Sequence, residues 1–456
     1  MTGLTSWRNG DEEDGYTVFV DSVSRASTAR RAFADHLAEL RDHWLRASAR
    51  PCLIRSVGIS FPEALLLLGL VLTTVAALSG WLHGTVLSAS VVSLAAGIVL
   101  AWTGTITVRP NAQLLLIAVE LALLLTLFAD GLMVEAELLR EQWQPPVRAL
   151  ALALPLTLCL LALAARLLFR QLSWSEAFLL GAILAPTDPV ITSSVVTSER
   201  VPETIRHTLN LESGLNDGLA LPLVLFFLVL AAPGGHAGRE GLHVLGEVGA
   251  GAILGIGLAL LAGRLLGRLP GGGILQRYEG VYSLGLAFAA YGIAESTYGN
   301  GLIAAFVAGI TLALARHDIP ETFVLFNESL SAAFQVITFV LFGALIFATG
   351  WHGSEWRVAL FIAFALLVAR PAAIWIAFGR ARLANPEKLF IAWFGPKGVA
   401  SMLFALLVLA SRAPDRNLIF QVAAYLIVAS IVAHGLTDTI GARWIEQRVV
   451  TEPGSA

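Results

Sequence analysis

Long apolar runs recur along the chain from residue 62 to residue 441, separated by short polar connections. Most runs are about 20 residues long, the length that an α-helix needs to cross the hydrocarbon core of a bilayer. They lack the strict alternation of apolar and polar positions that marks barrel strands. The pattern therefore predicts an all-α polytopic membrane protein with about 13 transmembrane helices. The expected spans are 62–82, 86–104, 113–134, 146–169, 174–197, 207–231, 243–267, 278–297, 299–315, 328–350, 356–378, 386–411 and 418–441.

The composition agrees with this pattern. Hydrophobic residues make up 56% of the chain and charged residues 14%, against about 45–50% and about 25% in a soluble domain. No basic patch with interleaved aromatic residues occurs, so we expect no nucleic-acid partner. The two cysteines give no disulfide or metal framework, and Walker, dinucleotide-binding and nucleophile–base patterns are missing. We therefore expect neither a cofactor nor enzyme activity.

Polar segments flank the apolar region. Residues 1–60 form a polar leader, in which 26–49 has the spacing of a short amphipathic helix. One interpretation is a surface helix or a poorly ordered leader, and the other is a regulatory or membrane-lying helix. Residues 61–441 form the expected transmembrane domain, and residues 442–456 form a short tail.

The connections on alternate sides of the expected spans differ in their content of Lys and Arg. The richer set should face the cytoplasm, which puts the C-terminus on the cytoplasmic side of the cell inner (plasma) membrane. With an odd number of spans the N-terminus then lies outside. The arginines of residues 1–60 conflict with that side. Either the leader is translocated against its charge, or the number of spans differs by one.

The sixth expected span carries an unusual density of polar side chains. An ionisable group near the bilayer centre costs about 2.5–3.5 kcal/mol on insertion scales, and this span contains both Glu212 and Asp217. At helical spacing Ser213 and Asp217 share one face, and Glu212 and Asn216 share the next. One face offers oxygen atoms, and its neighbour offers a carboxylate and an amide. This arrangement predicts a cation site with supporting groups beside it.

Two expected spans are interrupted at corresponding depths. The fifth contains LAPTDPV at 184–190, and the twelfth contains FGPKG at 394–398. Proline removes helix donors and clashes with the preceding turn, so both motifs indicate extended breaks. Two simple proline kinks are the alternative. Interrupted helices in corresponding positions of two halves, each with a charge in mid-span, point to a transporter site at the membrane midplane.

Four further charged or polar side chains have candidate roles. Asp188 could cap a half-helix, bind a cation, or do both, and Thr187 would offer its hydroxyl or carbonyl oxygen. Lys397 should neutralise the negative ends of half-helices, with proton transfer as the alternative. Arg370 either reaches the interface or pairs with Glu212 as a structural ion pair.

The remaining charges are weaker candidates. Asp130 is either interfacial or lines the access funnel to Asp217. Glu120 has no expected partner, and Glu328 and His207 are interpreted as charges at span boundaries.

The ordered set TDP, ESGLND, Arg-Pro and WFGPKG, over residues 62–441, resembles the monovalent cation:proton antiporter-1 family and its NhaP-type sodium/proton antiporters. The resemblance implies a dimerisation scaffold and a core with two crossed, discontinuous helices related by inverted repeats, the core lying around 174–231 and 356–441. It implies Na⁺ ligands at Asp217, Asp188, Ser213 and Thr187, with Asn216 supporting them. It also implies an ion pair between Glu212 and Arg370, and Asp130 matches the acidic residue that the family has in the third span. Lys397 departs from the arginine usual in its motif, which keeps the charge but not the forked donor set.

These observations predict a secondary antiporter that exchanges a monovalent cation for H⁺. Sodium is the first candidate cation, with potassium and lithium as alternatives. Asp217 would bind either a proton or a dehydrated cation, so that the two compete for one carboxylate and the exchange is electroneutral. We expect a homodimer in the lipid bilayer that works by alternating access. A sodium-coupled organic-solute symporter of related design is the first alternative, and a channel or a membrane scaffold is the second.

Overall fold

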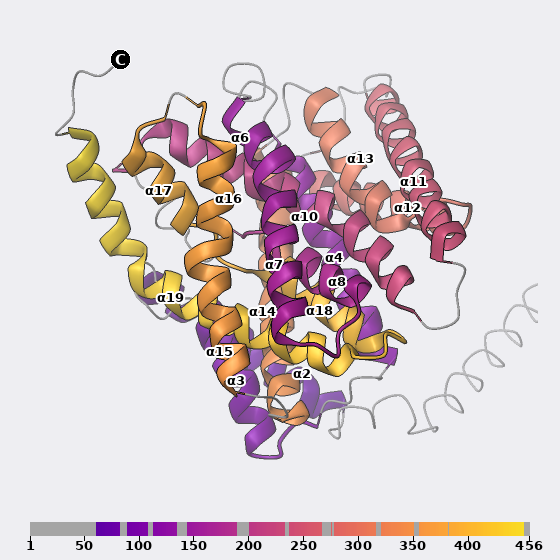
Figure 1. Ribbon diagram of the computed structural model, residues 1–456. Helices are drawn as coiled ribbons and strands as arrows, with labels where there is room; N and C mark the ends of the chain where they lie inside the picture. The colour runs from indigo at the N-terminus through magenta and orange to yellow at the C-terminus, as the bar shows by residue number, and fades with distance from the viewer. Residues whose placement is uncertain are drawn as a thin grey trace, which may run out of the picture. The chain divides into compact units, whose positions relative to one another are not determined.

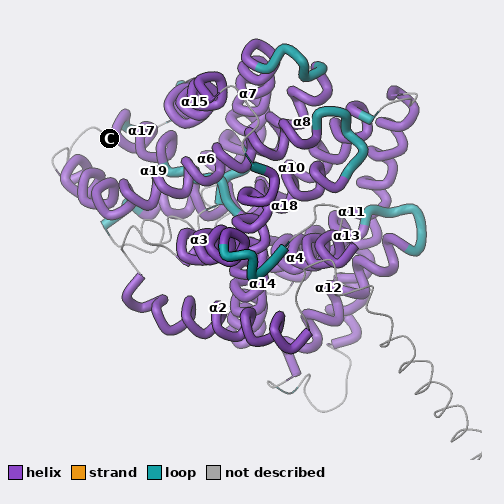
Figure 2. Tube along the Cα trace, turned by 90° about the horizontal axis from the view of Figure 1, so that it is seen from below, coloured by secondary structure: helices purple, strands orange, loops and turns teal. Residues whose placement is uncertain are grey.

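The computed structural model describes residues 61–82, 89–107, 113–134, 144–188, 200–232, 237–266, 275, 278–315, 321–350, 355–381 and 383–450. Within these ranges the regular elements are all helices (Figure 2), which confirms the all-α prediction. The predicted amphipathic helix at 26–49 lies outside the described residues, as does the part of the fifth span from residue 189 to its end at residue 197.

Each of the expected spans contains a described helix. The first seven spans correspond to α2 (Phe61–Leu82), α3 (Ala89–Trp102), α4 (Gln113–Leu132), α6 (Gln144–Arg148) with η1 (Ala149–Ala153) and α7 (Leu154–Leu168), α8 (Trp174–Leu184), α10 (Glu203–Ala231) and α11 (Ala237–Leu266). The others correspond to α12 (Glu279–Glu295), α13 (Gly301–Ala315), α14 (Glu321–Thr349), α15 (Glu355–Phe364) with η4 (Ala365–Ala369) and α16 (Arg370–Ala377), α17 (Asn385–Trp393) with α18 (Val399–Ala410), and α19 (Arg416–Val450).

The described helices differ in length. Within the described ranges, six continuous helical segments are by length and composition long and apolar enough to cross a membrane, among them Glu203–Ala231 and Arg416–Arg448. Others are apolar but shorter, including Ala89–Trp102 and Gly301–Ala315. The short helices are explained in part by interruption, because α8 and the pair α17 and α18 belong to spans that break in the middle.

The helices pack in two groups (Figure 1). In the first group α3 lies along α14, and α13 packs against α4, α11 and α12. The crossing of α4 and α13 is close, since a Cβ atom on Gly309 would lie 2.5 Å from the carbonyl oxygen of Phe128. In the second group α8 packs between α7 and α10, α18 packs on α19, and α16 packs on α17. The groups meet where α10 contacts α4 and α11, and where α18 contacts α4 and α14.

Spans four and eleven share a local irregularity. Each contains one turn of π-helix, Ala149–Ala153 in one and Ala365–Ala369 in the other. Each π-turn is followed two residues later by a proline, Pro155 or Pro371. Proline has no N–H to donate to the preceding turn, so the backbone bonding is rearranged just before it. The irregularity recurs seven expected spans apart, an odd number, so on that span count the two copies run in opposite directions, as inverted repeats require.

The two interruptions follow the same seven-span offset and contact one another. In the fifth span α8 ends at Leu184 and residues 185–188 are not helical; in the twelfth span residues 394–398 separate α17 from α18. The amide of Asp188 donates to the carbonyl oxygen of Pro396 at 2.9 Å. This bond brings both interruptions to one place inside the second helix group.

Candidate functional site

The polar face of α10 holds the first interruption by its backbone. Ser213 Oγ donates to the carbonyl oxygen of Thr187 at 2.8 Å, and Asn216 Nδ2 donates to the same oxygen at 2.9 Å. Asn216 Nδ2 also lies 2.9 Å from Thr187 Oγ1. The three side chains are buried. Ser213 and Asn216, which helical spacing placed on neighbouring faces of α10, therefore both contact Thr187.

The amide oxygen of Asn216 is left over in this arrangement. The carbonyl of Thr187 can only accept a hydrogen bond, so the amide nitrogen of Asn216 must face it and Oδ1 must point elsewhere. Asn216 Oδ1 is buried and has no hydrogen-bond partner among the residues that the structure describes. Buried polar atoms nearly always have a partner, and an amide oxygen is a suitable ligand for a hard cation.

Glu212, one turn before Asn216 on α10, contacts Arg370. Arg370 Nη1 donates to Glu212 Oε1 at 2.7 Å, and Nη2 donates to Oε2 at 3.2 Å. Arg370 Nη2 also lies 3.3 Å from the carbonyl oxygen of Ile391 near the end of α17. Gly395 leaves room for the guanidinium group, because a Cβ there would lie 2.0 Å from Arg370 Nε. The pair joins α10, α16 and the second interrupted span.

Asp188 of the fifth span caps α18, the helix that follows the interruption of the twelfth span. Its Oδ2 accepts a hydrogen bond of 3.0 Å from the amide of Val399, the first residue of α18. A carboxylate at this position satisfies a free amide and interacts favourably with the positive end of the helix. The fit is tight, because a Cβ on Gly398 would lie 2.0 Å from Asp188 Oδ2. Gly398 therefore leaves the space that this cap occupies.

Lys397 contacts the C-terminal end of α8, the helix before the first interruption. Its Nζ donates to the carbonyl oxygens of Ala185 and Pro186 at 3.2 and 3.1 Å. Those carbonyls follow the end of α8 and carry its negative end. The side chain of Lys397 is fully enclosed, with 3% of the residue exposed. These contacts place the ammonium group of Lys397 against the end of α8.

Asp217 lies on the side of α10 that faces the first helix group. On the same side, Gly214 approaches the backbone carbonyl of Asp130 in α4, to which an added Cβ would lie 3.5 Å away. Gly218, the residue after Asp217, packs under the ring of Phe306 in α13. Asp217 is buried, and the carboxylates of Asp130, Asp188 and Asp217 lie within electrostatic range of one another. The structure thus brings the three acids together at the boundary of the two groups.

Some side chains have partners that the sequence did not indicate. Glu120 was expected to have none, and that expectation is wrong: Tyr291 Oη of α12 donates to Glu120 Oε1 at 2.5 Å. His207 lies 3.2 Å from Glu203 at the start of α10, which agrees with a boundary position. The side chain of Glu328 is outside the described part of the structure.

Three residues around the interruptions were missed as candidates. Ser401 Oγ donates to the carbonyl oxygen of Ile183 at 2.8 Å, which ties α18 to the end of α8. Ser430 and His434 of α19 contact the second interruption. The only signal for them in the sequence was a polar residue at mid-span, which many membrane helices contain.

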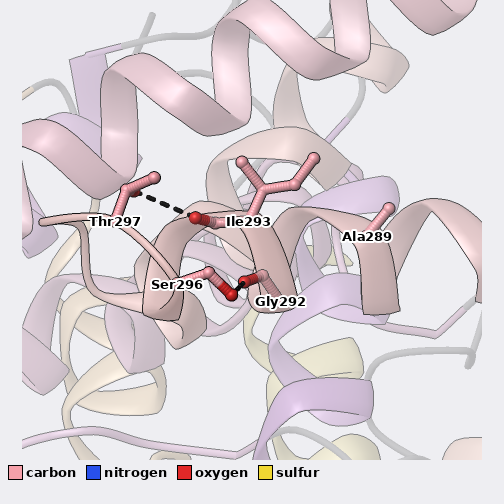
Figure 3. A pocket seen from close by; sticks show the side chains of 5 residues that line it. All are labelled: Ala289, Gly292, Ile293, Ser296 and Thr297. Carbon is pink, nitrogen blue, oxygen red and sulfur yellow. Dashed lines mark hydrogen bonds between the residues drawn. The ribbon is translucent and has the colours of Figure 1, made fainter.

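The groove shown in Figure 3 is separate from this polar centre. It has a volume of about 460 Å³ and is lined by Ala289, Gly292, Ile293, Ser296 and Thr297 at the end of α12. Ser296 and Thr297 turn their hydroxyls back onto the carbonyls of Gly292 and Ile293. The groove therefore presents an apolar surface with no free polar group among these five residues.

The donor set at the polar centre suits a small cation better than a transition metal. It combines carboxylate, hydroxyl, carbonyl and amide oxygens, the ligands that hard cations take. In the described part of the chain no cluster of three or more His, Cys, Asp or Glu side chains has the geometry of a metal site. Together, fold and site define a class: a polytopic helical membrane protein in which two interrupted helices meet at a buried polar centre, the architecture of secondary transporters.

The family is shown by comparison with known proteins. The transmembrane model of the sodium/hydrogen exchanger family matches residues 68–443, so the chain belongs to that family. The K⁺/H⁺ antiporter NhaP of Alkalimonas amylolytica is 25% identical over 349 residues, covering 75% of this chain and 60% of the relative. A K⁺/H⁺ antiporter NhaP2 of Shewanella oneidensis is 24% identical over 344 residues, covering 73% of this chain and 58% of the relative. The chain thus spans about 60% of the length of these curated relatives.

A solved structure supports the same fold. The sodium proton antiporter MjNhaP1 from Methanocaldococcus jannaschii, at pH 8, superposes with a TM-score of 0.70 and 20% sequence identity. The superposition covers 86% of this chain and 100% of that structure. At this identity the likeness establishes the fold alone.

Proposed function

We propose that this protein exchanges a monovalent cation for a proton across the membrane, with Asp217 binding each in turn. The observation that carries the proposal is the buried amide oxygen of Asn216, which has no hydrogen-bond partner in the described part of the chain. Asn216 directly precedes the buried Asp217 in the sequence. Its amide nitrogen donates to the carbonyl and hydroxyl oxygens of Thr187. A buried acceptor without a donor is costly, and a bound cation would remove that cost.

The cation would be held by oxygens from both α10 and the first interruption. Asp217 and Asp188 supply the charge, and Thr187 and Ser213 supply neutral oxygens. Ser213 and Asn216 already donate to Thr187, which fixes the loop while leaving their own oxygens able to accept. Arg370 holds the charge of Glu212, so that this acid stays out of the exchange. A proton on Asp217 and a cation beside it would then exclude one another.

Movement would occur between the two helix groups. We take the expected core around 174–231 and 356–441, extended by α6, η1 and α7 because α7 packs against α8, and the remaining helices as the scaffold and the dimerisation surface. Gly214 and Gly218 give α10 a smooth face against α4 and α13, because small residues let helix backbones approach closely. Sliding or rocking along this face would expose Asp217 to each side in turn. Asp130 would line the access route on the cytoplasmic side.

Sodium is the cation that we propose, in the inner membrane and with the C-terminus in the cytoplasm. The names of the matching proteins divide between potassium and sodium, so the assay must include both. Purified protein in proteoliposomes with an internal pH dye should respond to a sodium gradient, and lithium and potassium are tested alongside. Asp217→Asn should abolish the response, while Glu240→Gln, which removes an exposed carboxylate of α11, should keep it.

Several outcomes would contradict this proposal. Substantial exchange by a folded Asp217→Asn protein would show that another group carries the ion. Flux that requires an added organic solute would favour a symporter, and a current far above carrier turnover would favour a channel. A response to potassium and not to sodium would change the proposed cation but not the mechanism.

A further inference from the structure

The C-terminal end of α17, just before the second interruption, contacts a histidine of α19. Trp393 is the last residue of α17, and its carbonyl oxygen lies 2.8 Å from Nε2 of His434. Terminal carbonyls of a helix have no partner inside the helix. His434 is almost completely enclosed, with 2% of the residue exposed. The amide of Gly395 also donates to this carbonyl at 2.9 Å, so the imidazole is the partner that comes from another element.

Both ring nitrogens of His434 lie against backbone carbonyls. Nε2 lies 2.8 Å from the carbonyl oxygen of Trp393, and Nδ1 lies 2.6 Å from the carbonyl oxygen of Ser430 and 3.2 Å from Ser430 Oγ. A carbonyl oxygen only accepts, so each contact is a hydrogen bond only when that nitrogen carries a hydrogen. In the neutral tautomer with hydrogen on Nε2, and in the charged ring, Nε2 donates to Trp393. In that neutral tautomer Nδ1 can accept from the hydroxyl of Ser430.

Ser430 extends the contact to the other side of the interruption. The backbone amide of Lys397 donates to Ser430 Oγ at 2.9 Å. One turn of α19 thus binds the carbonyl before the break and the amide near its end. Trp393 itself is held a second time, because its indole Nε1 donates to Thr437 Oγ1 at 2.8 Å. Residues 394–398 are consequently anchored at both ends by side chains of α19.

The two interruptions are held in parallel ways. Ser213 and Asn216 of α10 hold the backbone of the first interruption at Thr187, and Ser430 and His434 of α19 hold the backbone of the second. These helices are the sixth and thirteenth spans, again seven apart. In the second repeat an imidazole and a hydroxyl take the place of an amide and a hydroxyl.

We propose that His434, acting through Ser430 and Trp393, is a positioning residue for the cation site. The second interruption carries two groups that fix Asp188: the carbonyl of Pro396 accepts from its amide, and the amide of Val399 donates to its carboxylate. It also carries Lys397, which holds the end of α8. A shift of residues 394–398 therefore displaces Asp188 relative to Asp217. His434 acts at a distance and does not touch the ion.

Two amide variants separate positioning from packing. His434→Gln keeps a donor near the place of Nε2, whereas His434→Asn keeps one near Nδ1 and cannot reach Trp393. We expect the apparent KM for the transported cation to stay within about twofold in the Gln variant. It should rise about three- to tenfold in the Asn variant, the range that corresponds to loss of one hydrogen bond. Ser283→Ala, which removes a buried hydroxyl of α12 in the other helix group, is the control and should leave KM unchanged.

A second readout does not depend on transport. The inference rests on the proposed function for its kinetic test, so amide hydrogen exchange of residues 394–399 is measured as well. Amide hydrogen exchange of these residues should be faster in His434→Asn and in Ser430→Ala than in His434→Gln. Equal KM and equal amide exchange in the Gln and Asn variants would overturn the positioning role while leaving antiport intact. If the histidine variants do not fold, wild-type KM and amide exchange in Ser430→Ala would overturn it. Absence of cation/proton exchange in the unmodified protein would instead count against the proposed function.

Discussion

Arg370 and Glu212 form a two-bonded ion pair between helices α16 and α10. The distances are 2.7 Å from Nη1 to Oε1 and 3.2 Å from Nη2 to Oε2, and the side chains are 7% and 5% exposed. Neither charge has access to bulk water, so each depends on the other for compensation. The pair also determines which acid of α10 is available, because Glu212 is occupied and Asp217 is not part of the pair.

This relationship predicts strong coupling between the two residues. Removing one partner of a buried pair typically costs about 3–5 kcal/mol, since the other charge is left uncompensated. Glu212→Ala and Arg370→Ala should therefore each lower the melting temperature strongly. The double variant should lose less than the sum of the two. Thermal unfolding of the three purified variants in one detergent measures this, and additive losses would mean that the residues are not coupled.

The pairing of Glu212 with Arg370 could be inferred from the sequence because a charge inside a membrane span requires compensation. The helices could be located for a related reason: a bilayer sets the length of each apolar run. These constraints act on single segments, so one sequence is sufficient to reveal them. The interrupted spans belong to the same category, since their prolines act locally.

Contacts that depend on tertiary packing could not be inferred in this way. Tyr291 meets Glu120 across 171 positions in the chain, and His434 meets Trp393 across 41. Nothing in the local pattern of either residue indicates the partner. The π-turns before Pro155 and Pro371 were missed because apolar periodicity does not distinguish a π-turn from an α-turn.

Gly398 should tolerate no side chain. A Cβ atom would lie 2.0 Å from Asp188 Oδ2, so Gly398→Ala must displace the carboxylate that caps α18. We expect cation-driven pH change to fall by at least about tenfold, because small misplacements at a site have large effects on rate. Gly257→Ala is the matched control, since a Cβ there meets nothing within 4 Å. Wild-type flux in Gly398→Ala would contradict the assigned position of Asp188.

Lys397 should affect stability before it affects affinity. Its ammonium group is bonded to the carbonyls of Ala185 and Pro186, and each buried carbonyl left without a donor costs about 1–3 kcal/mol. Lys397→Ala should lower the melting temperature, and Lys397→Arg should retain transport. Melting curves and flux are compared on the same preparations. A Lys397→Ala protein of normal stability but altered proton stoichiometry would make Lys397 a proton carrier instead.

Asp415 lies outside the membrane-spanning segments and makes a pH-dependent contribution to the stability of the folded protein. Partial burial, together with the nearby carboxylate of Glu176, raises the pKa of Asp415 above its usual range. The folded state therefore binds this proton more tightly than the unfolded chain, and its stability rises as pH falls through the pKa of the folded protein. Asp415→Asn keeps the backbone bond to Glu176 and should raise the melting temperature at pH 7.

The comparison with wild type isolates this contribution. The melting temperatures of the two proteins should converge as pH is lowered, because protonation removes the same repulsion in wild type. A difference that stays constant between neutral and acidic pH would show that Asp415 does not titrate in this way.

Counting the acids of the site predicts its stoichiometry. Asn216 cannot ionise, and Glu212 is held by Arg370. Asp188 accepts from the amide of Val399 at the positive end of α18, which stabilises its charged form. On the proposed function, Asp217 would then be the one acid of α10 that exchanges its proton, while Asp130 of α4 lines the access route. A second titrating acid beside Asp217 would behave with it as a coupled pair. We therefore expect one proton per monovalent cation and no net charge movement.

Membrane potential distinguishes one-for-one exchange from the alternatives. An imposed diffusion potential should change neither the initial rate nor the endpoint of sodium/proton exchange in proteoliposomes, because an electroneutral cycle has no net charge for the potential to drive. The potential is set with potassium and valinomycin if potassium is not itself exchanged, and otherwise with chloride and a chloride ionophore. A change in either quantity means that a second acid carries a proton. Asp130 and Asp188 lie within electrostatic range of Asp217, and Asp130→Asn, which removes the acid not held by a helix end, then identifies which of them it is.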